Sequence, residues 1–264
     1  MAAIVLVGQS HATVVAYYTF DEGAGTMAAD TASIYNAGDT AQDATTNQGT
    51  VGWTSGVVGG AVDLPGNASM QIADPFPAGT MAFTISLWVN MDDTPGYDGI
   101  FESRPENWGI NVEGGSAENL HIDYRYDNPP VGSGGSMGID SAGGSIVVGT
   151  WHNVLMTWDG ANGTGDMYLD GNLISSATGL TTTYVSTGWN IGDDPCCGGR
   201  ELNAQLDDIA VWDEVLSPAQ IQAIYADGIS ADSVGAPAAV NAVPEPATGL
   251  LLIVTSLGLL RFRR

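Results

Sequence analysis

The stretch LDDIAVW, residues 206–212, places two adjacent aspartates before an apolar run. In a β-strand alternate side chains face opposite sides, so Asp207 would share one face with Ile209 and Val211. Asp208 would share the other face with equally apolar neighbours. Either way one carboxylate lies among bulky apolar side chains, and burying it without a partner costs several kcal/mol. The stretch therefore predicts a charge that needs neutralising.

Basic side chains that could neutralise this carboxylate are scarce. The chain of 264 residues holds 30 acidic residues against six basic ones, all arginines, and its formal net charge is −24. Only Arg104, Arg125 and Arg200 precede the last four residues. A bound Ca²⁺ would neutralise Asp207 with oxygen ligands, including backbone carbonyls, and we expect this structural role. The alternative is a hydrogen-bonded structural carboxylate, for example one paired with Arg200.

A second polar cluster lies in HIDYRYD, residues 121–127, where His121, Asp123, Arg125 and Asp127 alternate along a predicted strand. The E-x-D-x-x-E arrangement of retaining glycosidases is absent from the sequence. So are the phosphate-binding loop, the dinucleotide fingerprint, the nucleophile elbow and the H-E-x-x-H motif. We therefore interpret the cluster as a polar sheet face and expect no catalytic activity.

Seven tryptophans could provide surfaces on which sugar rings stack. Trp88, Trp158 and Trp212 lie in apolar strand patterns, so we expect them in the core. The remaining aromatic residues near the polar cluster suggest a glycan site on a concave face. Its expected members are Trp108, Tyr124, Tyr126, Asp123 and Arg125.

The elements that must carry these residues are mostly strands, because apolar and polar residues alternate between glycine-rich turns. Asp170-Gly171 separates two of them and predicts a tight hairpin. One helix is expected over residues 217–228, capped by Ser217. The pattern predicts an all-β, two-sheet antiparallel jelly-roll sandwich with one short helix and a further apolar helix at the C-terminus. The expected strands are 14–20, 81–91, 108–113, 120–126, 151–159, 165–170 and 205–213.

The strongly acidic composition also limits the partners. Nucleic acid and anionic membrane surfaces would be repelled by a net charge of −24. Divalent cations or a saline medium fit this charge better.

Three features follow one another in the last 22 residues. They are the motif Val243-Pro244-Glu245-Pro246, an apolar run over 247–260, and the basic residues Arg261, Arg263 and Arg264. The run is shorter than the roughly 20 residues that span a bilayer. Arginines after it favour a cytoplasmic C-terminal end, which places the upstream chain outside. A buried core helix is the alternative.

The whole tail resembles the PEP-CTERM sorting signal of Gram-negative bacteria. The resemblance implies recognition by an exosortase-type membrane protease, a transient membrane anchor, and export to the cell envelope or extracellular matrix. At the other end, residues 1–12 hold a short apolar stretch and then Ser10-His11-Ala12, which favours the remnant of a signal peptide. A short first strand is the alternative reading of those residues.

The body of the chain resembles the LamG-like members of the concanavalin A-like jelly-roll superfamily. The matching stretches, in the family's order, are YYTFDEGAGTMAADTA, GVVGGAVDLPGNASMQIAD, FTISLWVNMDD, WHNVLMTWDG, GDMYLDGNLI and DDIAVWDEVLSPAQIQAIYADG. We accordingly divide the chain into a signal remnant (1–12), the LamG-like domain (13–229), a linker (230–242) and the sorting and membrane segment (243–264).

This resemblance implies a calcium site at the start of the last strand. Asp207 occupies the matching position, with carbonyl ligands expected near Phe20 or Asp21 and near Gly59 or the glycine after it. Asp30 is a further side-chain candidate. The family is mostly non-catalytic and its ligands vary widely.

Cys196 and Cys197 are adjacent, and their Cα atoms lie about 3.8 Å apart across a trans peptide, which would strain a bridge between them. Zinc lacks further cysteine or nearby histidine ligands. Export makes free thiols less favourable, so we expect a vicinal disulfide, with an intermolecular link as the rival.

These observations favour an exported, non-catalytic module at the cell surface that binds polysaccharide or matrix components and is stabilised by calcium. Two alternatives stay open: a structural matrix protein without a specific ligand, and a divergent polysaccharide-degrading enzyme.

Overall fold

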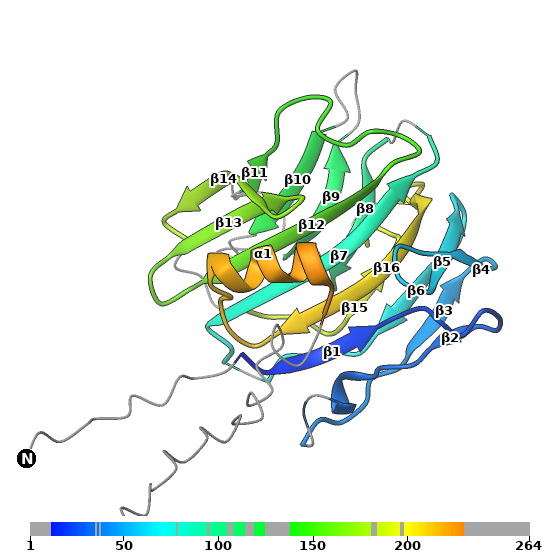
Figure 1. Ribbon diagram of the computed structural model, residues 1–264, viewed down its shortest axis with the longest axis horizontal. Helices are drawn as coiled ribbons and strands as arrows, with labels where there is room; N and C mark the ends of the chain where they lie inside the picture. Colours follow the sequence, from blue (N-terminus) through cyan, green and yellow to red (C-terminus); the bar gives the residue numbers. More distant parts are fainter. Residues whose placement is uncertain are drawn as a thin grey trace, which may run out of the picture.

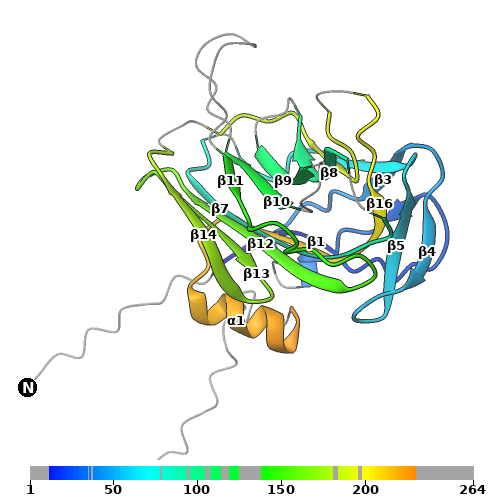
Figure 2. The same ribbon diagram turned by 90° about the horizontal axis from the view of Figure 1, so that it is seen from above.

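The computed structural model describes residues 12–229, except 35, 37, 78, 94–95, 105–107, 114–118, 125–137, 181–183 and 196–197. Within these residues two antiparallel sheets pack face to face, and one short α-helix lies outside them (Figures 1 and 2). The all-β sandwich with one helix that the sequence predicts is confirmed.

The first sheet has eight strands, in the order β14-β13-β12-β7-β16-β5-β4, and β1 also pairs with β16. Every pairing in it is antiparallel. Its strands are β1 (Val14–Tyr18), β4 (Gly52–Ser55), β5 (Gly60–Pro65), β7 (Ala82–Met91), β12 (Trp151–Asp159), β13 (Thr164–Leu169), β14 (Asn172–Thr178) and β16 (Asn203–Trp212).

The second sheet also has eight strands, in the order β11-β10-β9-β8-β15-β6-β3-β2. Several of its strands are short and polar, which is why the alternation of the sequence does not predict them. Its strands are β2 (Met27–Ala28), β3 (Ala44–Gln48), β6 (Ser69–Ile72), β8 (Asp98–Ser103), β9 (Trp108–Glu113), β10 (Asn119–Tyr124), β11 (Gly138–Asp140) and β15 (Trp189–Ile191).

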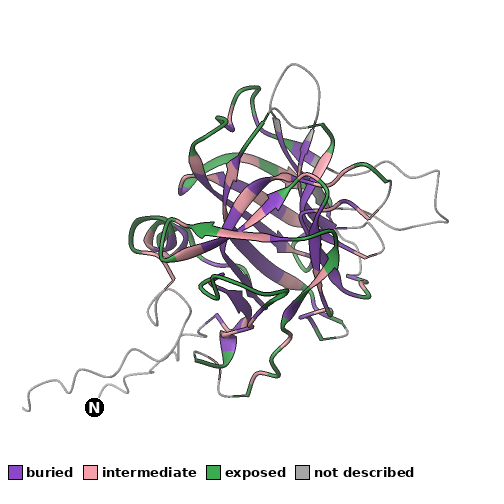
Figure 3. Cartoon of the chain, turned by 90° about the vertical axis from the view of Figure 1, so that its right-hand side faces the viewer, coloured by how far each residue is buried: buried purple, intermediate pink, exposed green. Residues whose placement is uncertain are grey.

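The core between the sheets contains a cluster of aromatic rings. Phe83 is fully buried, and its ring centroid lies 5.3 Å from that of Trp158 and 5.6 Å from that of Trp108. Trp108 is only 1% exposed. The expectation that Trp108 forms part of a glycan-stacking surface is therefore wrong, because its strand turns this side chain into the sandwich. In Figure 3 the buried residues follow the strands and the exposed ones gather in the turns.

The helix α1 (Pro218–Asp227) begins and ends as its sequence predicts. The Ser217 and Gln220 side chains form a capping box at its first turn, and Gly228 ends it. Ile221 and Ile224 are buried in a second apolar cluster with Trp212. This cluster lies on the outer face of the first sheet, which α1 covers in part (Figure 2).

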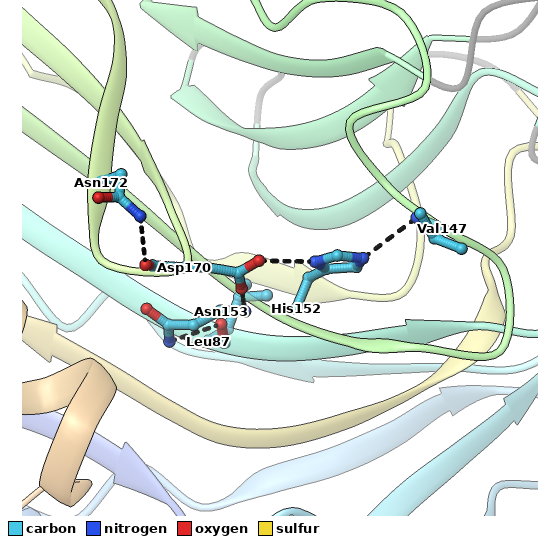
Figure 4. A network of polar contacts seen from close by, with 6 residues as sticks. All are labelled: Leu87, Val147, His152, Asn153, Asp170 and Asn172. Carbon is cyan, nitrogen blue, oxygen red and sulfur yellow. Dashed lines mark hydrogen bonds and ion pairs between the residues drawn. The ribbon is translucent and has the colours of Figure 1, made fainter.

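The predicted hairpin between β13 and β14 is present, and its turn is anchored by polar contacts (Figure 4). Asp170 and Gly171 have φ values of 48° and 73°, as a two-residue turn of this kind requires. The Asp170 carboxylate accepts a hydrogen bond from the backbone N–H of Asn153 at 2.9 Å and lies 2.9 Å from His152 Nδ1. His152 Nε2 accepts from the Val147 N–H, so the Nδ1 atom carries the proton toward Asp170.

Several expectations fall outside the described residues. They are the signal remnant before residue 12, Cys196 and Cys197, the linker, and the sorting motif with its apolar helix. Among the described residues, the structure contains no helix with the length and apolar character to span a bilayer.

We expect Asp170→Gly, which keeps the positive φ of this position, to lower the free energy of unfolding by about 1–3 kcal/mol, because two charge-assisted hydrogen bonds to the turn are lost. The control is Asp227→Ala, which removes an exposed carboxylate from α1 and should change stability by less than about 0.5 kcal/mol. Chemical denaturation measures both. Equal stabilities of the two variants would contradict the anchoring role of Asp170.

Candidate metal site

Along one edge, the last strand β16 pairs first with β5 and then with β1. Asp207 and Asp208 lie between these two pairings. Up to Leu206 the strand pairs with β5, and from Ile209 onward it pairs with β1. On the other edge the register with β7 shifts between Asp207 and Ala210. Asp208 takes a φ of 47°, which fits a bulge at this point.

The bulge overturns the simple alternation expected for this stretch. Leu206 and Ile209 both belong to the main core cluster, although regular pleating would turn them to opposite faces. Asp207 therefore does not share a face with Ile209 and Val211 as predicted. It lies opposite Trp88 of β7 and is nevertheless fully buried, because the turn between β4 and β5 covers it.

The Asp207 carboxylate has one satisfied oxygen and one unsatisfied one. Its Oδ2 accepts hydrogen bonds from the N–H groups of Val57 and Val58, at 2.8 and 3.1 Å. Its Oδ1 is buried without a hydrogen-bond partner among the described residues. Burial raises the pKa of Asp207 to about 7, and the nearby charge of Asp208 adds to the rise. The protein alone thus disfavours the ionised form of this group.

Two glycines beside the β4–β5 turn lie against backbone oxygens, and one of them also lies against this carboxylate. A side chain at Gly56 would collide with both the Gly60 carbonyl oxygen and Asp207 Oδ2. A Cβ at Gly60 would lie 2.5 Å from the Phe20 carbonyl oxygen. Small residues are therefore required where these oxygens converge.

Asp21 joins the same group from the other side. Its Oδ1 accepts a hydrogen bond from the Gly60 N–H at 2.6 Å, and an added Cβ on Gly59 would collide with it. Phe20, two residues after the end of β1, has a φ of 52°. The β4–β5 turn therefore contacts both aspartates, Asp207 through Val57 and Val58 and Asp21 through Gly60. The calcium ligands that the sequence resemblance implies stay a prediction.

Asp208 adds further negative charge. It is buried, its Oδ1 accepts from the Tyr17 hydroxyl at 2.7 Å, and burial, with the charge of Asp21, raises its pKa. Arg200 contacts Asp194 instead, so the alternative of an Arg200–Asp207 pair is wrong. The described residues that surround Asp207 give it no ion pair.

Asp30 has a different environment from the one expected. Both of its oxygens accept backbone N–H groups at 3.0 Å: Oδ1 from Tyr17 and Ala32, and Oδ2 from Gln42. These contacts hold the segment that contains the short 3₁₀ helix η1 (Ala32–Ile34) against β1. The structure gives Asp30 a backbone-binding role and shows no contact between it and the Asp207 group.

These residues fit a hard cation such as Ca²⁺ by donor type. An unpaired carboxylate oxygen and carbonyl oxygens are ligands that Ca²⁺ prefers. Among the described residues no three His, Cys, Asp or Glu side chains form a metal-binding group. An ion here would therefore depend on backbone carbonyls as well as on Asp207.

The expected glycan site lies on the second sheet and is only partly described. Tyr124 pairs with Trp108 across β9 and β10, and Asp123 pairs with Gly109. Beyond this backbone pairing, the side chains of Asp123 and Tyr124, and all of Arg125 and Tyr126, lie outside the described residues.

The outer face of the second sheet carries polar side chains that are largely enclosed. Glu102 is fully buried and accepts a hydrogen bond from Asn111 at 2.9 Å. His121 Nδ1 lies 2.6 Å from Asp140 Oδ1, and His121 is 9% exposed. Asn190 is 3% exposed. Glu102 and His121 are each held by a side chain of a neighbouring strand, whereas Asn190 donates to Asp193 in the loop that follows, at 3.1 Å.

A family model described as the concanavalin A-like lectin/glucanases superfamily matches residues 64–222. Curated relatives are Sushi, von Willebrand factor type A, EGF and pentraxin domain-containing protein 1 of Rattus norvegicus, 24% identical over 152 residues, and of Mus musculus, 29% identical over 87 residues. The alignments cover 54% and 30% of this chain but only 4% and 2% of those proteins.

Solved structures share the fold at low identity. Domain 4 of AbnA, an extracellular arabinanase from Geobacillus stearothermophilus, in complex with arabinotriose, has a TM-score of 0.62 at 18% identity. That match covers 82% of this chain and all of the domain. The receptor-binding domain of a botulinum neurotoxin C/D mosaic serotype has a TM-score of 0.60 at 14% identity, over 81% of this chain and 51% of that one.

In metal-free buffer we expect stability to fall as the pH rises from about 4 toward 7. The folded pKa of Asp207, about 7, exceeds the unfolded value of about 3.9, so in this window the folded state holds a proton that the unfolded state releases. Asp207→Asn should lose this contribution to the dependence of stability on pH. Thermal melts with a chelator between pH 4 and 8 measure it, and parallel profiles for the two proteins would contradict the assignment.

Proposed function

The chain belongs to the concanavalin A-like lectin/glucanase superfamily, and from this membership we propose that it is a non-catalytic carbohydrate-binding module stabilised by calcium. The superfamily name covers both sugar-binding and sugar-cleaving proteins, so the choice between them depends on the carboxylates. The fully matched AbnA domain, solved in complex with arabinotriose, supports the binding role.

The state of Glu102 is the observation that carries this choice. Glycosidases need two carboxyl groups that flank the scissile bond and can reach the sugar or its attacking water. Glu102 is fully buried and bonded to Asn111, and His121 is engaged by Asp140. In the part of the chain that the structure describes, Glu102 is closed off from solvent and each of these two side chains is held by a neighbour on the second sheet, which supports binding without cleavage.

The proposed calcium ion lies at Asp207. Residues that would hold it are Asp207 through Oδ1 and the carbonyl groups of Phe20 and Gly60, with Asp21 beside them. The ion would supply positive charge to a buried carboxylate at the point where β16 changes neighbours. It would therefore act on stability and not on chemistry.

We place the protein outside the cytoplasm, at the cell envelope or in the extracellular matrix. This proposal rests on the sequence of the tail, Val243–Pro246 with the basic residues after it, which lies outside the described residues. An exosortase-type protease would be the partner that processes it.

Removal of calcium should destabilise the protein. A ligand at 100 times its dissociation constant adds about 2.7 kcal/mol, so a chelator should lower the Tm by about 5–10 °C. Asp207→Ala should show no chelator shift, whereas Asp227→Ala should shift like the wild type. Metal analysis of the purified protein gives the stoichiometry. A wild-type Tm that ignores the chelator, in a protein free of metal, would rule the site out.

The binding role predicts affinity for polysaccharide without product. Purified full-length protein should be retarded by at least one soluble polysaccharide in affinity electrophoresis and should release no reducing ends from it during long incubation. Reducing ends that accumulate with protein concentration and time would revive the enzyme alternative. Absence of retardation across a broad panel would favour the purely structural alternative.

A further inference from the structure

Two of the tryptophans that remain partly accessible lie on the outer face of the first sheet. Trp88, on β7, and Trp151, on β12, are both half-buried, whereas Trp108, Trp158 and Trp189 are enclosed in the core. Asn90 pairs with Trp151, and Trp88 pairs with Asn153. The two indole-bearing positions are thus diagonal neighbours on one face, within about 8 Å of each other.

Trp88 is held in place by the helix. Its ring stacks on that of Tyr225 of α1, with centroids 5.7 Å apart and an interplanar angle of 24°. The Gln222 side chain donates to the Gly171 carbonyl, which fixes α1 against the β13–β14 turn. One end of the accessible face is therefore bounded by a rigid aromatic pair. Trp151 stands at the first position of β12, beyond this pair.

A row of polar side chains continues from Trp151 across the sheet. Cross-strand registers connect Trp151 to Asn90, Asn90 to Gln205, and Gln205 to Asp63 of β5. Asn90 donates to the Gln205 side-chain oxygen at 2.8 Å. These side chains are all half-buried, unlike the enclosed groups of the second sheet. Strands are about 4.8 Å apart, so the row is roughly 15 Å long.

The chemistry of this row matches an extended sugar chain. An indole ring offers an apolar face for the C–H side of a sugar ring, and amides offer donors and acceptors to its hydroxyl groups. Side chains already fixed by stacking and hydrogen bonds lose little freedom when a ligand binds.

The charge of the face decides the class of sugar. Asp63 belongs to the row, and Gln205 donates to Asp92 at 2.7 Å, while Asn203 donates to Asp93 at 2.7 Å. The described arginines make their contacts elsewhere, Arg104 with Gln71 and Arg200 with Asp194. A uronate-rich or sulfated chain would be repelled by these carboxylates, so the face favours an uncharged sugar chain.

We propose that the outer face of the first sheet binds an uncharged polysaccharide chain laid across β12, β7, β16 and β5. Trp151 and Trp88 form the stacking surface, and Asn90 and Gln205 bind hydroxyl groups. The inference rests on the proposed carbohydrate-binding function and names its site and its ligand class.

Affinity electrophoresis of the full-length protein tests the site. The probes are the uncharged polymers hydroxyethyl cellulose, arabinan, arabinoxylan and galactomannan, with alginate and chondroitin sulfate as anionic counterparts. Trp151→Ala should weaken retardation by an uncharged polymer by about tenfold or more, and Gln205→Ala by several-fold. Trp151→Phe should recover part of the affinity because it restores a ring.

The matched control is Tyr97→Ala, which removes an exposed aromatic ring directly before β8 and should bind within twofold of the wild type. Melting curves check the folding of Trp151→Ala, which we expect to be folded because Trp151 is partly exposed. If it is unfolded, the affinities of Trp151→Phe and Gln205→Ala test the site instead. Wild-type affinity in the row variants would overturn this site and leave the proposed function intact. Preference for the anionic polymers would overturn the ligand class. Binding of no polymer by the wild type would remove both proposals.

Discussion

The strand β16 pairs with β5 up to Leu206 and with β1 from Ile209, so the two residues between them lack a partner along that edge of the strand. One of these two residues is Asp207, whose side chain is fully buried. The backbone forms a bulge at this point, and the Val57 and Val58 N–H groups donate to the enclosed carboxylate of Asp207. The first strand, the last strand and the β4–β5 turn all meet there. How this carboxylate is balanced therefore affects the closure of the whole first sheet.

Local rules of sequence account for much of the fold. The Asp170-Gly171 turn, the capping box at Ser217 and the strands Trp108–Glu113 and Trp151–Asp159 all follow from turn chemistry and alternation over a few residues. The short polar strands of the second sheet do not, because their pairing depends on neighbours that are distant in sequence.

The site residues divide in the same way. The β4–β5 turn contacts both Asp207 and Asp21, two residues that the family resemblance singles out, but the bulge that sets the direction of Asp207 depends on the change of neighbours. The burial of Trp108 could have been predicted from the sequence, because Trp108, Ile110 and Val112 occupy alternate positions of one strand and all three are buried. The sequence pattern does not predict that Trp151 is partly exposed, because the exposure of a residue at the beginning of a strand depends on which other segments pack over that residue.

The two ends of the folded body lie side by side. Val14 at the beginning of β1 pairs with Trp212 at the end of β16, and the Asp213 N–H donates to the Thr13 carbonyl oxygen at 3.1 Å. A folded unit whose entry and exit share one strand pair occupies little length along a polypeptide, and it can be inserted between other segments without separating them. Force applied to both ends would act where β1, β16 and β7 meet, because Trp212 also pairs with Thr84 of β7 and packs against α1.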